Sequence, residues 1–133
     1  MVMGSSLGGV YATAVAERCG CQAVLINPAV DPARDLARYI GDQTTWQNPA
    51  EHFYFASHFV DELRDLVAGP LRHPDHYLTF VAQGDEVLDW REMAARYAST
   101  DLRVLPGGDH ALSDFDDHLP AILDFLKPGA ARV

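Results

Sequence analysis

The pentapeptide Gly4-Ser5-Ser6-Leu7-Gly8 lies near the start of the 133-residue chain and has the form G-x-S-x-G. Residues 2–3 before it are apolar, as at the end of a β-strand, and residues 7–18 after it are typical of a helix. A serine at the apex of such a tight strand-to-helix turn has strained backbone geometry and an exposed hydroxyl. Larger side chains two positions before and after it are expected to collide, which favours glycine at both places. Ser6 is therefore the candidate nucleophile, Ser5 is the alternative, and a glycine-rich turn without chemistry also fits the pentapeptide alone.

The composition is that of an ordinary globular protein, with 48% hydrophobic and 22% charged residues, so neither disorder nor a membrane span is expected. The formal net charge of -9 disfavours binding to nucleic acid or to anionic membrane surfaces. No signal-peptide pattern opens the sequence, so cytoplasmic localisation is the expectation. Cys19 and Cys21 are a poor zinc site and lie too close together for a structural disulfide, so reduced thiols are expected.

The order of apolar and polar residues predicts alternating strands and helices. Apolar and β-branched runs predict strands at residues 1–3, 22–26, 77–83 and 102–105. Helical spacing predicts helices over residues 7–18, 31–39, 58–67, 90–98 and 117–126. This alternation predicts the α/β class, a three-layer sandwich with a mostly parallel sheet and helices on its faces.

Caps and buried positions can be predicted for the later helices. Ser57 is the candidate N-cap of the third helix and Asp89 that of the fourth. The last helix is expected to end at Pro128-Gly129 and to bury its apolar residues, which are Ile122, Leu123, Phe125 and Leu126.

The whole chain, residues 1–133, is expected to form a single domain, with residues 41–68 as a small cap segment within it. More residues lie between the second and third predicted strands than a minimal crossover requires, which is typical of a lid over a site. Trp46, Phe53 and Tyr54 lie in this stretch. Ordinary core packing is the alternative for each of these aromatic residues.

Candidate catalytic residues follow three of the predicted strands. Ser6 follows the first strand, Asp85 follows the third after Gly84, and His110 follows the fourth. Reactive groups gather at the carboxyl ends of the strands in an open parallel sheet, so these three side chains are expected to meet. Serine, then acid, then histidine is the chain order of an α/β-hydrolase triad.

Each of these residues has a role in such a triad. His110 would accept the proton of the Ser6 hydroxyl and return it to the leaving group, while Asp85 would hold the imidazole tautomer. The backbone N–H of Leu7, at the start of the helix, would donate to the oxyanion. A second donor is expected from a loop after an earlier strand, and that loop is not in this sequence.

The sequence contains other acidic residues and histidines near the predicted site or elsewhere in the chain. Glu86 and Asp89 are alternative acids, but Asp85 is preferred because it follows the strand and the glycine directly. Asp109 is expected to be a surface turn residue. The remaining histidines are expected to be solvated and to bind no metal ion, and no cofactor is expected. These histidines are His52, His58, His73, His76 and His118.

Four segments of the chain resemble blocks of the YqiA-type esterases, small bacterial α/β-hydrolases without a large lid domain. These segments are residues 2–9, 26–30, 84–90 and 107–111, whereas residues 31–75 match only loosely. The resemblance implies a hydrolase of small carboxylic esters or acyl thioesters such as acyl-CoA, without a cofactor. It places Ser6, Asp85 and His110 on the triad of that family.

Members of that family begin well before the G-x-S-x-G turn, with an H-G-F-type loop that supplies the second oxyanion donor. The resemblance therefore implies that residues 1–133 correspond to the C-terminal part of the fold. Loss of one oxyanion donor costs on the order of a hundredfold in rate, so an impaired remnant that acts as a binding module is the alternative function. Acyl transfer to an acceptor other than water is a third hypothesis. An exposed sheet edge also predicts homo-oligomers.

Overall fold

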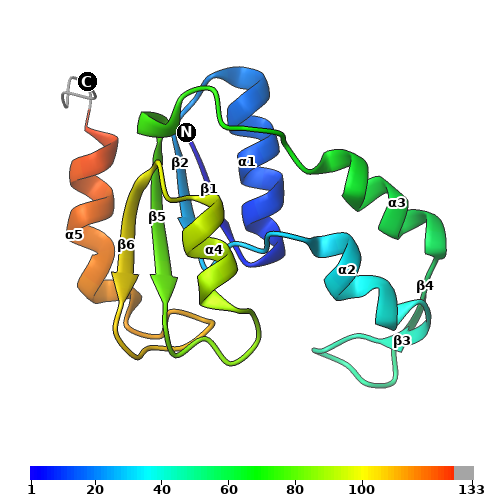
Figure 1. Ribbon diagram of the computed structural model, residues 1–133. Helices are drawn as coiled ribbons and strands as arrows, with labels where there is room; N and C mark the ends of the chain where they lie inside the picture. The colour runs from blue at the N-terminus through cyan, green and yellow to red at the C-terminus, as the bar shows by residue number, and fades with distance from the viewer. Residues whose placement is uncertain (128–133) are drawn as a thin grey trace. The chain divides into compact units, whose positions relative to one another are not determined.

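The computed structural model describes residues 1–127, so the expected helix end at Pro128-Gly129 lies outside the described residues. The elements are β1 (Val2–Ser5), α1 (Leu7–Cys19), β2 (Ala23–Ile26), α2 (Pro32–Leu36), the 3-10 turn η1 (Ala37–Tyr39), β3 (Gly41–Thr44), β4 (His52–Phe55), α3 (Ser57–Leu66), the 3-10 turn η2 (Pro74–His76), β5 (Tyr77–Ala82), α4 (Trp90–Arg96), β6 (Asp101–Leu105) and α5 (Phe115–Leu126) (Figure 1). They form two compact units. The sheet unit is Met1–Val30 with the chain from Ala68 onward, and the insert unit is Asp31–Val67.

The sheet unit contains four strands in the order β1-β2-β5-β6. Each neighbouring pair is parallel, with Val2 opposite Ala23, Ala23 opposite Tyr77 and Leu78 opposite Asp101. This arrangement confirms the mostly parallel sheet expected from the alternating elements. Among the described residues, no strand pairs with the outer edge of β1.

Helices cover both faces of this sheet. As a result, every residue of the two central strands, β2 and β5, is buried. One face packs against α1 and the end of α4, and the residues in this cluster are Ala12, Ala16, Ala23, Leu25, Tyr77 and Tyr97. The other face packs against α5 and the loop before it, and the residues here are Val24, Ile26, Leu78, Phe80, Leu112 and Ile122. Alternate residues of one strand thus enter opposite clusters, which gives the three layers seen in Figure 1.

The helix caps and buried positions differ in part from the expectation. Asp89 is the N-cap of α4, and its Oδ1 accepts from the N–H of Arg91 at 2.9 Å. Ser57 is not a cap, because Ala56 precedes α3 and makes no side-chain bond. In α5, Ile122 is 2% exposed but Leu123 is 55% exposed, so the expected burial of Leu123 is wrong. Adjacent residues point about 100° apart around a helix, and only one side of α5 faces the sheet.

The insert unit contains α2, η1, the β3–β4 hairpin and α3. Asp31 caps α2 by accepting from the N–H of Arg34 at 3.2 Å. β3 and β4 are antiparallel, with Gly41 opposite Phe55. The sequence did not predict this hairpin, because the segment Gly41–Thr44 shows no apolar alternation. Trp46 is 92% exposed, so it is not a core residue.

Two smaller expectations concern the cysteines and the membrane. Cys19 and Cys21 are free thiols, as predicted. Within residues 1–127, no helix combines the length and the apolar character that crossing a membrane requires.

Candidate active site

Ser6 occupies the turn between β1 and α1 with φ 57° and ψ −122°. A non-glycine residue with positive φ is strained, and such strain persists only where the surroundings fix it. The N–H of Ser6 donates to the carbonyl of Ile26 at 3.0 Å. Its carbonyl accepts from the N–H groups of Gly9 and Ala29, both at 2.9 Å. The backbone of Ser6 is therefore held on both sides, and its conformation is fixed by β2 and α1 together.

The two glycines of the pentapeptide play different parts. A Cβ on Gly4 would lie 2.1 Å from the carbonyl oxygen of Gly8, so β1 can approach α1 only if residue 4 is glycine. A Cβ on Gly8 would meet no heavy atom within 4 Å. The expected collision is thus right for Gly4 and wrong for Gly8, because Gly8 faces β1 with its carbonyl. The second glycine that has no room for a side chain is Gly9. A Cβ added there would lie 2.5 Å from the Cβ of Pro28, in the loop after β2.

The structure brings Ser6, His110 and Asp85 together at the carboxyl ends of the strands. The Oγ of Ser6 lies 2.8 Å from Nε2 of His110, and Nδ1 of His110 lies 2.7 Å from Oδ2 of Asp85. The Asp85 side chain is fully buried, whereas that of His110 is 18% exposed. If Nδ1 carries the proton and donates to Asp85, Nε2 is free to accept the Ser6 proton.

The Asp85 carboxylate is fixed by its own loop. Its Oδ1 accepts from the N–H groups of Val87 and Leu88, both at 2.8 Å, while Oδ2 faces His110. Both oxygens are therefore occupied, and the carboxylate cannot rotate without losing hydrogen bonds.

The loops that carry Asp85 and His110 pack backbone against backbone. The N–H of Gly84 donates to the carbonyl of Gly107 at 2.7 Å. A Cβ on Gly84 would lie 2.3 Å from the carbonyl oxygen of Gly108. This contact has no room for a side chain at residue 84, and it keeps the acid close to the histidine.

The other acids near the site make different contacts. Glu86 is exposed, and its Oε2 accepts from the backbone N–H of His110 at 2.9 Å, a contact that the sequence did not predict. Asp89 caps α4, as described above. Asp109 accepts from the N–H of Ser113 at 2.8 Å, and the hydrogen bonds from Ser113 hold the pKa of Asp109 below its usual value. Asp109 is thus a partly exposed residue whose side chain stabilises the loop after His110.

Leu7 is the first residue of α1 and directly follows Ser6. The first N–H groups of an α-helix have no partner within the helix and lie at the positive end of its dipole. The Leu7 N–H therefore lies next to Ser6 in the chain, at the positive end of the helix dipole.

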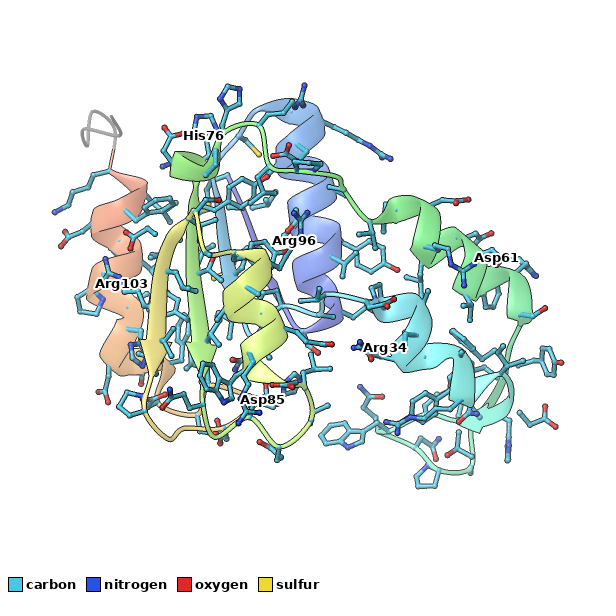
Figure 2. All side chains as sticks on the ribbon, viewed as in Figure 1. Arg34, Asp61, His76, Asp85, Arg96 and Arg103 are labelled. Carbon is cyan, nitrogen blue, oxygen red and sulfur yellow. The ribbon has the colours of Figure 1, made fainter. Side chains whose placement is uncertain are left out.

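Three other side chains with metal-binding atoms lie close together at the opposite end of β5. The ligand atoms of His73, Asp75 and His76 are all within 4.8 Å of one another, and the two imidazole rings stack with centroids 4.9 Å apart. The sequence did not predict this proximity. Figure 2 places His76 at the start of β5 and Asp85 beyond its other end, so this group is separate from the Ser6 site.

Three solved structures share the fold of this chain. A protein of Agrobacterium vitis S4 gives a TM-score of 0.67 at 20% identity, over 95% of this chain and 61% of that one. The esterase domain of a Rhodothermus marinus protein gives a TM-score of 0.59 at 22% identity, over 87% of this chain and 55% of that one. Mouse alpha/beta hydrolase domain-containing protein 10 gives a TM-score of 0.59 at 20% identity, over 95% of this chain and 62% of that one. The chain thus has the α/β-hydrolase fold, and it spans about three fifths of the length of these structures.

The comparison with protein families agrees with the resemblance to YqiA-type esterases. The matching model is that of the uncharacterised protein family UPF0227, and the match covers residues 1–127. Because nearly the whole chain is matched, this protein belongs to the uncharacterised protein family UPF0227.

Proposed function

We propose that this protein is a serine hydrolase that cleaves carboxylic esters or acyl thioesters through an acyl-enzyme intermediate. The observation that supports this most strongly is the hydrogen-bonded chain from Ser6 Oγ through His110 to the buried Asp85. The strained conformation of Ser6 adds support, because such strain is common at catalytic nucleophiles.

In the acylation step, Oγ of Ser6 attacks the carbonyl carbon of the substrate and His110 Nε2 accepts the hydroxyl proton. Asp85 stabilises the imidazolium, and the Leu7 N–H donates to the carbonyl oxygen as it becomes negative. His110 then returns the proton to the alcohol or thiol that leaves. In the second step, His110 Nε2 accepts a proton from a water molecule that attacks the acyl carbon, the bond to Ser6 Oγ breaks, and His110 returns the proton to Oγ as the carboxylic acid leaves.

The proposed substrates are small esters or thioesters, and short-chain acyl esters and acyl-CoA are the first compounds to test. The esterase domain of the Rhodothermus marinus protein shares this fold, which supports the choice of ester substrates. The formal net charge of -9 makes nucleic acid an unsuitable partner. Cytoplasmic localisation remains a prediction from the sequence, and cell fractionation would check it.

The two adjacent serines provide a matched test. We expect Ser6→Ala to lower hydrolysis of a p-nitrophenyl ester and of acyl-CoA by about a thousandfold or more. Ser5→Ala should stay within about threefold of the wild type, because the Ser6–His110–Asp85 chain does not include Ser5. Circular dichroism should show that both variants are folded. Equal hydrolysis by the Ser6→Ala variant and the wild type would overturn the proposal, and inactivity of a folded wild-type protein would favour a binding module.

A further inference from the structure

Asn27 directly follows β2 and is fully buried, with 0% of its surface exposed. Its φ of 41° lies in the left-handed region, which asparagine tolerates better than most residues. Its backbone N–H donates to the carbonyl of Phe80 at 2.9 Å. This residue is thus fixed at the carboxyl end of the sheet, next to the strands that precede Ser6 and Asp85.

The side-chain amide of Asn27 makes three hydrogen bonds, all to backbone atoms. Its Oδ1 accepts from the N–H of Ala82 at 2.8 Å. Its Nδ2 donates to the carbonyl of Asp109 at 3.1 Å and to the carbonyl of His110 at 2.9 Å. The orientation of the amide follows from these partners, because only Oδ1 can accept and only Nδ2 can donate.

These bonds join segments that are far apart in the chain. Ala82 is the last residue of β5 and precedes Asp85 by three positions, whereas His110 is in the loop after β6. The residue before Asn27 is Ile26, whose carbonyl accepts the Ser6 N–H. The buried amide therefore connects the backbone segments that carry the acid and the histidine, and the residue before Asn27 holds the backbone of the nucleophile.

We propose that Asn27 is a positioning residue that holds the backbone of His110, so that its ring spans the distance from Asp85 to Ser6. This inference rests on the proposed hydrolase function. Glu86 holds the N–H of the same residue from the exposed side, so the two contacts fix both backbone polar groups of His110. The Asn27 residue is itself fully buried, so a lost partner of its Nδ2 is not readily replaced by water.

The chain contains a matched control for substitutions of Asn27. The tripeptide Asn27-Pro28-Ala29 recurs as Asn48-Pro49-Ala50 in the insert unit. Asn48 is exposed, and its Oδ1 accepts only a local bond, from the N–H of Ala50 at 3.1 Å. The same substitution can therefore be made in the same tripeptide without any contact to His110.

The test compares Asn27→Asp with Asn48→Asp. Asn27→Asp keeps the size and an acceptor for Ala82, but it removes both N–H donors to the His110 loop. We expect kcat for a p-nitrophenyl ester to fall by about ten- to a hundredfold, because small displacements of catalytic groups have effects of this size. KM should stay within about threefold, since Asn27 is fully buried and not open to a substrate. Asn48→Asp should leave both constants unchanged.

A second readout does not depend on activity. Ring resonances of His110 in the nuclear magnetic resonance spectrum should shift in Asn27→Asp and not in Asn48→Asp. If the wild type hydrolyses no ester, the proposed function fails, while these resonances still report whether Asn27 positions His110. Asn27→Gly keeps the positive φ and replaces Asn27→Asp if the buried carboxylate prevents folding.

The proposal is overturned if a folded Asn27 variant keeps the wild-type kcat, or if its His110 resonances are unchanged. It is also overturned if neither Asn27 variant folds, because the residue would then serve folding and not the position of His110.

Discussion

The sheet unit and the insert unit bury their residues to very different degrees. Every residue of β2 and β5 is buried, and helices cover both faces of the sheet. In the insert unit Val60 and Leu63 are buried, but Trp46 and Tyr54 are 92% and 62% exposed. Ser6, Asp85 and His110, the proposed triad, all belong to the sheet unit. A substitution there should therefore affect catalysis or folding, whereas one in the exposed hairpin region should have little effect on stability.

The largest expected effect is that of Asp85→Asn in the sheet unit. The amide keeps the shape of the carboxylate but cannot hold the catalytic tautomer of His110, so we expect kcat to fall by about ten-thousandfold. KM should change little, because the Asp85 side chain is fully buried and not open to a substrate. Steady-state kinetics on a p-nitrophenyl ester measure both. A decrease of less than tenfold would show that Asp85 is not the acid, and Glu86→Gln would then be the variant to compare.

The next effect concerns the two glycines of the G-x-S-x-G pentapeptide, Gly4 and Gly8. Gly4→Ala places a Cβ 2.1 Å from the Gly8 carbonyl, so we expect a loss of about 3 kcal/mol or more in the free energy of unfolding. Gly8→Ala is the control, because its Cβ meets nothing within 4 Å and alanine favours a helix by up to about 1 kcal/mol. Urea denaturation measures both variants. Equal destabilisation of the two would contradict the close approach of β1 to α1.

The outer edge of β1 gives a third prediction. Unpaired strand edges associate, so we expect the wild-type chain to form dimers or larger assemblies in light scattering. Met3 is 49% exposed on β1, and Met3→Lys should shift the protein towards the monomer, because lysine on an edge strand disfavours pairing. Leu123→Lys, on the exposed side of α5, is the control and should leave the mass unchanged. A monomeric wild-type chain would contradict this prediction.

A smaller effect is expected at Glu17 in α1. Burial opposes its ionisation, but hydrogen bonds from the Tyr77 hydroxyl and the Arg72 N–H outweigh it and hold the pKa of Glu17 below the ordinary 4.5. Burial, followed by the contact with Glu17, raises the pKa of Tyr77 well above its usual value. A lowered pKa in the folded state stabilises the protein above pH 4.5, and this contribution disappears as the pH falls through the lowered value.

Glu17→Gln should therefore cost about 1 kcal/mol at neutral pH and progressively less below pH 4.5. Thermal or urea unfolding of the variant and the wild type between pH 3 and pH 7 measures this difference, at about one-unit intervals. A cost that is independent of pH would show that the charge of Glu17 does not contribute to stability.

The smallest effect on stability is expected in the insert unit. Trp46→Ala should change the free energy of unfolding by no more than about 0.5 kcal/mol, because the side chain is 92% exposed. If residues 41–68 form a cap, as the sequence predicts, Trp46→Ala should also raise the KM for a long-chain ester and leave kcat unchanged. An unchanged KM for short and long esters would contradict the cap function.

The sheet unit could be predicted from the sequence because its strands are continuous apolar runs between clear turns. Residues 22–26 and 77–83 were predicted as strands, and β2 (Ala23–Ile26) and β5 (Tyr77–Ala82) confirm them to within one residue at each end. The hairpin of the insert unit could not be predicted, because its strands are four residues long and mostly exposed. Such strands have no alternation between a buried and an exposed face.

The proximity of Ser6, Asp85 and His110 was predictable because each follows a strand of one parallel sheet. The sequence does not predict the contacts of Asn27 and Glu86 with His110, and it offers Glu86 only as an alternative acid, since each residue acts on backbone atoms of His110. Their separations along the chain are 83 and 24 residues, and backbone partners leave no pattern in a single sequence. The three-residue motif Asn-Pro-Ala also occurs twice, and only tertiary structure distinguishes the buried copy from the exposed one.

The most direct test of the proposed hydrolase is covalent labelling of the serine by a fluorophosphonate, followed by intact-mass and peptide mass spectrometry. An activated serine attacks the phosphorus and displaces fluoride, and the phosphonate remains on its oxygen. We predict one adduct per chain, on Ser6, that is lost in Ser6→Ala and retained in Ser5→Ala. A folded wild-type protein that takes up no label, or an adduct that persists in Ser6→Ala, would contradict the assignment of Ser6 as the nucleophile.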